Sequence, residues 1–403
     1  MADRPMPGRA AGRRIEPALV VVLGGVAAAL HVGKLPPAIP VLREALQLSL
    51  VQAGFLLSLV QVAGMALGLA VGLAGDSLGL KRCMTAGLLV LGAASLAGGL
   101  AQDAATLLAL RAVEGCGFLL AATPAPSLIR RVAAPGELDA KMGLWGAYMP
   151  LGTALALLAG PLLLPRIGWP GWWWLLAALS LAMAAWLWRA LPPDPLRTGA
   201  ASAGWKDRLR RTLAAPGPWL LALGFAVYSG QWLAVVGFLP TIYAQARVGP
   251  AAAGALTALV AVVNMVGNIG AGRLLRRGVA ARTLLRAGYA AMALGALLAF
   301  LPALDFGPAA RTGAVVLFSM LGGMVPATLF ALSQRLAPGP DTVSTTVGWM
   351  QQCSAVGQFL GPPVVAWIAR QAGGWQWTWA ATGLCSLAGI LIAGRLAGLQ
   401  PRR

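Results

Sequence analysis

Two pairs of ionisable residues interrupt long apolar stretches of the sequence. The stretch RAVEGCG places Arg111 and Glu114 three residues apart, and the stretch LHVGKLPPAIP places His31 and Lys34 at the same spacing. On a helix, side chains three residues apart lie on one face, so the two members of each pair can touch. Ionisable groups are costly to bury in a membrane and usually face water or a ligand, so these positions predict binding or proton transfer.

The charges of these two pairs do not balance. Lys34, Arg111 and, when protonated, His31 are positive, whereas Glu114 is the only carboxylate inside an apolar span. We therefore expect Lys34, Arg111 and His31 to bind an anionic solute, and Glu114 or His31 to carry a coupled proton. Each residue also has a purely structural alternative. Arg111 and Glu114 can form a neutral pair that only joins helices. Lys34 can extend to the membrane surface, and His31 can be an ordinary packed side chain.

Neutral hydrogen-bonding side chains in the C-terminal half are expected to form the second part of the site. The residues predicted to contact the solute are Gln231, Trp232, Asn264, Gln351 and Gln352. Asn268 and Gln358 are similar side chains in the same spans. Amide groups suit the orientation of a small polar ligand. The alternative is that they only join helices, as most amides in membrane helices do.

The elements that must hold these residues are membrane-spanning helices. Of the 403 residues, 58% are hydrophobic and 11% are charged, which excludes a soluble globular domain of this length. Apolar runs of spanning length occur at 17–40, 51–75, 83–101, 105–129, 140–164, 170–190, 216–241, 250–274, 284–304, 311–333, 343–369 and 375–396. The sequence therefore predicts an all-α membrane protein with twelve transmembrane helices in two pseudo-symmetric six-helix bundles. The predicted domains are a tail at 1–16, bundles at 17–190 and 216–396, a linker at 191–215 and a tail at 397–403.

The basic residues predict the orientation of the chain in the membrane. A net charge of +19 would suggest nucleic acid as the partner of a soluble protein, but here the charges lie in short clusters between spans. Of the 31 Lys and Arg residues, 24 lie on the side of the two termini and six on the opposite side, with Arg111 inside a span. Both termini are therefore expected in the cytoplasm, in a multi-pass protein of the cell inner (plasma) membrane. The first apolar run is expected to be a retained helix, and the four cysteines, which lack metal-ligand spacing, free thiols.

A short charged loop, GLAGDSLGLKR, follows the second span. Gly72 lets a neighbouring helix approach closely, Asp76 sits where it can cap the third helix, and Gly79 permits a turn. Lys81 and Arg82 are expected to face the acidic cytoplasmic surface of the membrane. These five residues are predicted to form a conformational latch.

The loop resembles the one between the second and third helices of the major facilitator superfamily, Gly-x-Leu-Ala-Asp-Arg-x-Gly-Arg-Arg. Gly72, Asp76, Gly79 and Lys81 match, and Ser and Leu replace two of the family's arginines. RAVEGCG resembles the family's Arg-x-x-x-Gly-x-Gly pattern in the fourth helix. GKLPPAIP and MPLG resemble the cyanate and nitroimidazole-type permeases of that family. The resemblance implies alternating access, with Asp76 holding the cytoplasmic helix ends together in the outward-open state.

The second half contains a degenerate copy of this loop. GRLLRRGVAAR, from Gly272 to Arg282, occupies the corresponding place after the eighth span. Arg276 replaces the acid, and the spacing to the next glycine is one residue shorter. Such a repeat is typical of transporters, but without the acid this copy cannot perform the same latch chemistry.

The expected function is secondary active transport of a small anionic solute, organic or inorganic, by symport with a proton. The alternative is proton-driven efflux of drugs or other amphipathic compounds, which one interior acid and two bases disfavour. The sequence has no GxSxG or HExxH motif and no ATP-binding loop. We therefore expect no enzyme activity, cofactor or metal. The expected partners are the solute, the lipid bilayer and a coupling proton, with no nucleic acid, and the expected state is a monomer.

Overall fold

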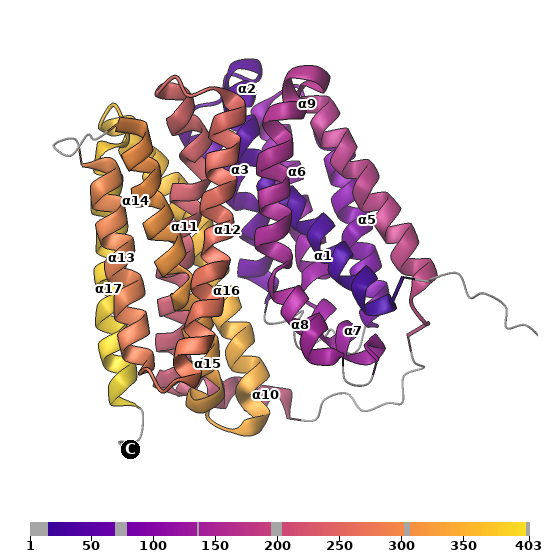
Figure 1. Ribbon diagram of the computed structural model, residues 1–403. Coiled ribbons are helices and arrows are strands. Elements are labelled where there is room, and N and C mark those ends of the chain that lie inside the picture. Colours follow the sequence, from indigo (N-terminus) through magenta and orange to yellow (C-terminus); the bar gives the residue numbers. More distant parts are fainter. Residues whose placement is uncertain (1–14, 69–78, 135–136, 195–203, 302–306, 400–403) are drawn as a thin grey trace, which may run out of the picture.

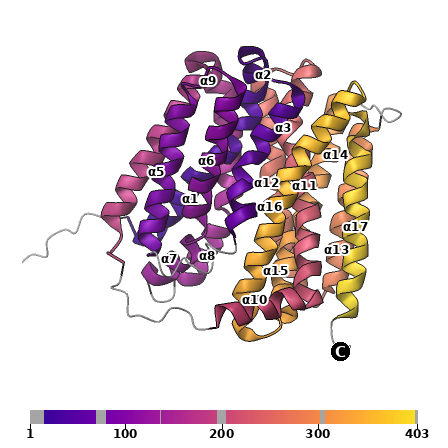
Figure 2. The same cartoon turned by 180° about the vertical axis from the view of Figure 1, so that it is seen from behind.

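The computed structural model describes residues 15–68, 79–134, 137–194, 204–301 and 307–399 (Figure 1). The first half contains α1 (Pro17–Gly33), α2 (Leu35–Ala45), α3 (Leu50–Ser58), the 3-10 helix η1 (Leu59–Gln61), α5 (Leu80–Gly98), α6 (Ala104–Ala122), α7 (Ala125–Val132), α8 (Leu138–Gly146) and α9 (Tyr148–Ala190). The second half contains α10 (Trp205–Ala214), α11 (Pro216–Gln245), α12 (Pro250–Arg276), α13 (Ala281–Phe300), α14 (Gly307–Gly322), α15 (Met324–Leu336), η3 (Pro340–Thr342), α16 (Val343–Gln371), η4 (Trp375–Trp377) and α17 (Thr378–Gly398). Figures 1 and 2 show the helices of the two halves as two groups, side by side.

The described helices account for the predicted spans. Ten helical stretches of the described residues are long and apolar enough to cross a membrane. One of them, α9, has 43 residues and consists of two helices joined at Gly168, whose φ of 67° lies in the left-handed region that favours glycine. α16 has 29 residues and packs along α11, although its sequence is more polar. With α9 counted as two and α16 added, the all-α fold of twelve spans is confirmed. The predicted residue limits of the two bundles stay a prediction.

The first span is interrupted near its middle. α1 ends at Gly33 and α2 begins at Leu35, with Lys34 between them. Pro36 and Pro37 have no backbone N–H, so they cannot complete the helical hydrogen bonds to the carbonyls four residues earlier. The span continues to Ala45, beyond the predicted end at residue 40, and places Lys34 about 16 Å from the end of the helix. Lys34 is therefore deeper in the span than its sequence position suggested.

Glycines bring α5 and α6 into backbone contact. A Cβ on Gly87 would lie 2.6 Å from the carbonyl oxygen of Gly117, and a Cβ on Gly117 would lie 2.7 Å from the backbone nitrogen of Leu91. A larger residue at either position would push the two helices apart. This close approach holds Ser95 of α5 and Arg111 of α6 against the first span.

The two groups of helices contact each other along α3 and α16, and α9 contacts α12 toward one end of the molecule. A Cβ on Gly54 of α3 would lie 2.9 Å from the Cα of Pro363 in α16, and a Cβ on Gly254 of α12 would lie 2.6 Å from the carbonyl oxygen of Leu157 in α9. These contacts lie near the ends of α3, α12 and α16 that the sequence places outside the cell. A groove of about 430 Å³ lies at the same end between α2 and α11, lined by Pro40, Arg43, Glu44, Gln47, Thr241, Ala244 and Gln245.

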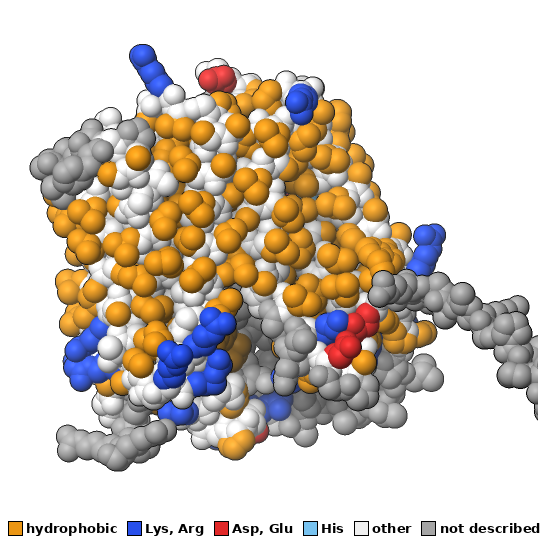
Figure 3. Space-filling view, in the orientation of Figure 1, with side chains coloured by type: hydrophobic (Ala, Val, Ile, Leu, Met, Phe, Trp, Pro, Cys, Tyr) orange, Lys and Arg blue, Asp and Glu red, His pale blue; other side chains and the backbone are white. Residues whose placement is uncertain are grey.

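The surface has the pattern of a multi-pass membrane protein. Figure 3 shows apolar side chains over the sides of the molecule, with most of the visible Lys and Arg side chains near the lower end. Large apolar side chains such as Leu100 and Leu384 are 67% and 70% exposed. In Figure 1 the lower end holds α7, α8 and α10. The assignment of this end to the cytoplasm rests on the excess of basic residues and stays a prediction.

Candidate functional site

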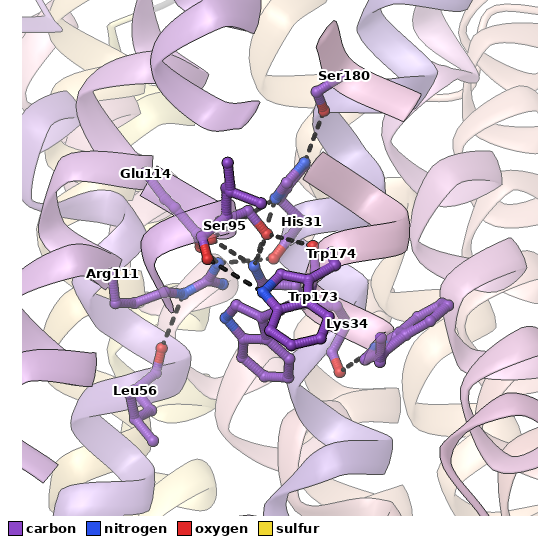
Figure 4. A network of polar contacts seen from close by, with 11 residues as sticks. His31, Lys34, Leu56, Ser95, Arg111, Glu114, Trp173, Trp174 and Ser180 are labelled. Carbon is purple, nitrogen blue, oxygen red and sulfur yellow. Dashed lines mark hydrogen bonds and ion pairs between the residues drawn. The ribbon is translucent and has the colours of Figure 1, made fainter. Parts of the chain in front are cut away.

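Glu114 is the centre of a buried group of ionisable side chains (Figure 4). Its Oε2 accepts a hydrogen bond from Arg111 Nη1 at 2.6 Å, and its Oε1 accepts one from Lys34 Nζ. His31 Nδ1 lies 3.7 Å from Glu114 Oε1. All four side chains belong to residues that are at most 2% exposed. We call these four residues the charge cluster. The structure thus brings together the two pairs that the sequence places in different spans.

Lys34 enters the charge cluster from the interruption between α1 and α2. Its Nζ also donates to Ser95 Oγ at 3.0 Å, and it lies 3.4 Å from His31 Nδ1 and 4.4 Å from the centroid of the Trp173 ring. Lys34 is fully buried, so it does not extend to the membrane surface. Its polar partners and the aromatic face replace the water that the ammonium group has lost.

His31 connects the charge cluster to α9. Its Nε2 lies 2.7 Å from Ser180 Oγ. Because an ammonium group can only donate, His31 Nδ1 accepts from Lys34, and the proton of the neutral ring is then on Nε2, which donates to Ser180. A continuous line of hydrogen bonds therefore runs from Ser180 through His31 and Lys34 to Glu114.

Arg111 joins α6 to two other spans. Its Nε donates to the carbonyl of Leu56 at 3.1 Å, and its Nη1 donates to the carbonyl of His31 at 2.7 Å. Leu56 precedes the point at which α3 gives way to η1 at Leu59. Arg111 Nη2 is buried and has no hydrogen-bond partner within the described part of the chain. This nitrogen can donate to a ligand without breaking the other contacts of the guanidinium.

The charge cluster carries a surplus of positive charge. When His31 is neutral, two cations share one carboxylate, and the ion pairs involve Lys34, Arg111 and Glu114 only. Buried ions are stable only when they are paired and well hydrogen-bonded. A small anion that joined the cluster would balance its charge.

A second polar network lies in the second half of the chain. Asn264 Nδ2 donates to the Tyr228 hydroxyl at 2.9 Å and to the Ser319 carbonyl at 2.8 Å. Trp232 Nε1 donates to Ser319 Oγ at 2.9 Å, and Asn268 Nδ2 donates to Asn264 Oδ1 at 3.0 Å. This network joins α11, α12 and α14. Two of the predicted solute-binding residues, Trp232 and Asn264, therefore lie together.

The three glutamines predicted with them have different surroundings. Gln231 accepts a hydrogen bond from Ser386 Oγ at 3.0 Å. Gln352 Nε2 donates to the carbonyl of Met65 at 2.8 Å, and Gln351 is exposed. Within the described residues, no recorded contact joins these glutamines to the charge cluster. Their role in binding the solute stays a prediction.

The predicted latch lies partly outside the described residues, which include neither Gly72 nor Asp76. Gly79 precedes α5 with a φ of 86°, in the region that favours glycine. Lys81, expected at the membrane surface, is instead buried, because its Nζ donates to the Leu191 carbonyl at 2.6 Å and lies over the ring of Trp188. Arg82 is exposed.

Asp194, which lies four residues beyond the end of α9, caps the start of α5. Its carboxylate accepts from the backbone N–H groups of Lys81 and Arg82, each at 3.0 Å, and from Arg131 Nη1 of α7 at 2.8 Å. Burial opposes its ionisation, but these donors outweigh burial and hold the pKa of the Asp194 carboxyl below its ordinary value. The sequence placed Asp194 in the linker and expected the cap from Asp76.

Sequence reasoning also missed several partners of the predicted residues. Ser95, Trp173 and Ser180 contact the charge cluster, and Gln61 of η1 donates to Gln358 Oε1 of α16 at 3.0 Å, across the two halves. Serine and tryptophan are common in apolar helices, so nothing in their spacing distinguished them. Gln61 could have been found as an amide inside the second span.

Known proteins resemble this chain in sequence and in fold. Residues 21–362 match the sequence profile of the Major Facilitator Superfamily. The puromycin resistance protein pur8 of Streptomyces alboniger is 38% identical over 127 residues, which are 31% of this chain and 25% of that protein. The cyanate transport protein CynX of Escherichia coli K12 is 26% identical over 256 residues, which are 62% of this chain and 64% of that protein. The chain thus spans less than two thirds of the length of these relatives. A bacterial homolog of the human lysosomal transporter Spinster has the same fold, with a TM-score of 0.73 and 17% identity over 94% of each chain.

Proposed function

Because this chain belongs to the Major Facilitator Superfamily, we propose that it is a secondary active transporter that moves a small anionic solute by alternating access, coupled to a proton. In this proposal the chain is a transporter without enzyme activity and works as a monomer. It lies in the cell inner membrane with both termini in the cytoplasm. Its partners are the solute, the lipid bilayer and the coupling proton.

The observation that carries this proposal is the surplus positive charge of the charge cluster. Lys34 and Arg111 share the carboxylate of Glu114, and Arg111 Nη2 has no partner among the described residues. A small anion that accepts from Nη2 would balance the charge, and a guanidinium is a strong donor to oxyanions. The interruptions at Lys34 and Leu59 lie beside the cluster. Discontinuous helices of this kind often bind solutes and ions in transporters.

In the proposal, proton coupling follows because the positive charge of Arg111 is shared between the anion and Glu114. An anion that binds Arg111 weakens the hold of the guanidinium on Glu114, which sits 2.6 Å from it. Glu114 then binds a proton more readily, and by linkage a proton on Glu114 favours binding of the anion. His31 is the second candidate, because it lies within the same line of hydrogen bonds.

The position of the contacts between the two halves supports alternating access. Their contacts at Gly54 and Gly254 lie toward the predicted outer end, as in a form that is closed to the outside. In the proposal, the amides and the indole of the second half complete the solute site when the halves turn relative to each other. These residues are Gln231, Trp232, Asn264, Gln351 and Gln352.

A thermal-shift screen of the purified protein tests the proposal. The ligands are sodium salts of small carboxylates, cyanate and nitrate at constant ionic strength, with cationic dyes as the contrasting class. A ligand that binds only the folded protein raises its melting temperature, so we expect stabilisation by anions and none in Arg111→Gln. The stabilising anion should then enter proteoliposomes faster under an imposed pH gradient. Stabilisation by cationic dyes alone would overturn the proposal.

The second candidate function is proton-driven efflux of drugs or other amphipathic compounds. It is favoured by the 38% identity to the puromycin resistance protein over 127 residues. The same screen separates the two functions, because an efflux pump for cationic drugs would be stabilised by the dyes and would be insensitive to the small anions.

A further inference from the structure

Five arginines surround the turn between α12 and α13, at positions 273, 276, 277, 282 and 286. All five are exposed. Gly278 has a φ of 87° and reverses the chain between the two helices. We call these five residues the arginine turn. It is the second-half counterpart of the latch loop, and the transport proposal leaves it without a role.

The arginine turn differs from the other basic groups near it, because it has no carboxylate partner within the described chain. On α7, Arg131 pairs with Asp194 at 2.8 Å, and on α10, Arg210 pairs with Asp207 at 2.9 Å. The recorded ion pairs of the described residues include none of the five arginines of the turn. Unpaired like charges repel one another, so an anionic partner would stabilise their close placement.

The arginine turn lies at the edge of the apolar surface that faces the membrane. On α12, Val266 and Ile269 are 56% and 50% exposed, and on α17, Leu391 is 63% exposed. Arg286 reaches α17, where its Nη2 lies 3.4 Å from the position of a Cβ on Gly394. Figure 3 shows basic side chains gathered at the lower edge of the apolar surface. The guanidinium groups are therefore at the depth of lipid head groups.

We propose that the arginine turn binds the phosphate group of an acidic phospholipid in the cytoplasmic leaflet. Arg282 and Arg286 are four residues apart on one face of α13, so both can donate to one phosphate. The remaining three arginines add to the attraction of an acidic membrane surface. The acyl chains would lie against exposed apolar side chains of α13 and α17, such as Leu294 and Leu391, because these two helices pack on each other. The lipid thereby holds the cytoplasmic ends of α13 and α17 together.

The test compares lipid binding by two charge-matched variants of the full-length protein. The protein is placed in nanodiscs of phosphatidylcholine with a rising fraction of phosphatidylglycerol, and its melting temperature is measured. Native mass spectrometry counts the lipids that remain bound. We expect Arg282→Gln/Arg286→Gln to need about 30-fold more phosphatidylglycerol for the same rise in melting temperature, because it loses the attraction of two basic residues to an acidic surface. Arg130→Gln/Arg189→Gln removes two exposed arginines of the first half and should bind like the wild type.

Two further experiments test where the phosphate comes from and whether the paired N–H donors of the guanidinium are needed. Glycerol phosphate and inorganic phosphate in solution should not reproduce the stabilisation, and Arg282→Lys/Arg286→Lys should recover part of the binding, because lysine keeps the charge but not the fork. The proposal is overturned if both double glutamine variants lose binding equally. It is also overturned if phosphatidylcholine is retained as well as phosphatidylglycerol, or if free phosphate stabilises the protein to the same extent.

Discussion

At the scale of single residues, Glu114 is the group on which the charge cluster depends. It is the carboxylate partner of both Lys34 and Arg111, and all three are buried. Replacing it removes the negative charge and leaves two buried cations without a counter-charge. We expect Glu114→Gln to lower the free energy of unfolding by about 3–5 kcal/mol, measured by thermal unfolding in detergent.

Two controls accompany this prediction. Glu137→Gln removes a carboxylate that is 51% exposed, so it should cost less than about 1 kcal/mol. Lys34→Met/Glu114→Gln restores the surplus of one positive charge and should be more stable than Glu114→Gln alone. Equal stability of Glu114→Gln and wild type would show that the cluster is not held by its ion pairs.

Arg111 is expected to contact the anion through Nη2. The other guanidinium nitrogens make hydrogen bonds that hold Nη2 in position. Its Nε and Nη1 are engaged by the carbonyls of Leu56 and His31 and by Glu114, and Nη2 remains. Lysine keeps the charge but cannot make all of these contacts and still reach a ligand. Arg111→Lys should therefore weaken anion binding by about tenfold or more, read from the ligand dependence of the melting temperature. Arg166→Lys, at an exposed arginine, should bind the anion like the wild type. Unchanged affinity in Arg111→Lys would remove Arg111 from the solute site.

The members of the charge cluster could be predicted from sequence, but their neighbours could not. Arg111, Glu114, His31 and Lys34 stand out because ionisable residues are rare in apolar spans and lie one helical turn apart. The partner that each side chain meets on another helix depends on how helices pack, and spacing within one helix does not report this. Ser95 is an example: it lies on α5 and contacts Lys34, which lies 61 residues earlier in the chain.

At the scale of elements, the start of α5 depends on a residue that follows α9. Asp194 accepts from two backbone N–H groups of α5 and from Arg131. Asp194→Ala should lower the free energy of unfolding by about 1–2 kcal/mol, as for the loss of a helix cap. The control is Asp207→Ala, at an exposed aspartate, which should lower the free energy of unfolding by less than about 1 kcal/mol.

The stabilisation that the Asp194 carboxylate provides should also decrease as the pH falls. Its folded-state pKa lies below the ordinary value of 3.8, so its contribution is complete above that value and is lost as the pH falls through the folded-state pKa. The difference in melting temperature between Asp194→Ala and wild type should therefore be constant from pH 8 to about pH 5 and shrink at lower pH. A difference that grows on acidification would contradict this account.

Gly79 is predicted to be required both for its backbone angle and for its lack of a side chain. A Cβ there would lie 2.5 Å from Asp194 Oδ2, whereas a Cβ on Gly204, with a similar φ of 89°, would meet nothing within 4 Å. Gly79→Ala should therefore cost about 1–3 kcal/mol more than Gly204→Ala, because it also displaces the cap from α5. Thermal unfolding of the two variants measures the difference. Equal losses would mean that the angle alone matters.

The helices themselves could be predicted because apolar runs of spanning length are visible in the sequence. The α5 cap could not, since PPDP is typical of a linker and the carboxylate of Asp194 meets α5 only after α9 has packed beside it. The break in α9 at Gly168 is different, because the predicted spans 140–164 and 170–190 already end and begin on either side of it.

At the scale of the whole molecule, the contact between α9 and α12 favours a form closed at the predicted outer end. A large side chain at Gly254 would separate α12 from α9 there, because even a Cβ would lie 2.6 Å from the Leu157 carbonyl. We expect Gly254→Trp to shift the protein toward an outward-open form and to stop transport without preventing insertion. A cysteine at Thr241, which lines the outer groove and is 3% exposed, reports the change.

An impermeant maleimide added from outside should label Thr241→Cys about tenfold faster in the Gly254→Trp protein, which corresponds to a shift of about 1.4 kcal/mol between the two forms. The control is Gly249→Trp, because a Cβ on Gly249 meets nothing within 4 Å. Equal labelling in the two tryptophan variants would show that the contact at Gly254 does not close the outer end. Sequence reasoning could not predict which end is closed, because both forms of a transporter share one sequence.

The bonds that Arg111 makes to the Leu56 and His31 carbonyls also have a mechanical consequence. They join α6 to the first and second spans, in each case three residues before the point where that helix is interrupted. We therefore expect a displacement of one of the three helices to be passed to the other two. If a solute binds the charge cluster as proposed, we expect the resulting displacement to reach the boundary between the halves, where Gln61 meets Gln358.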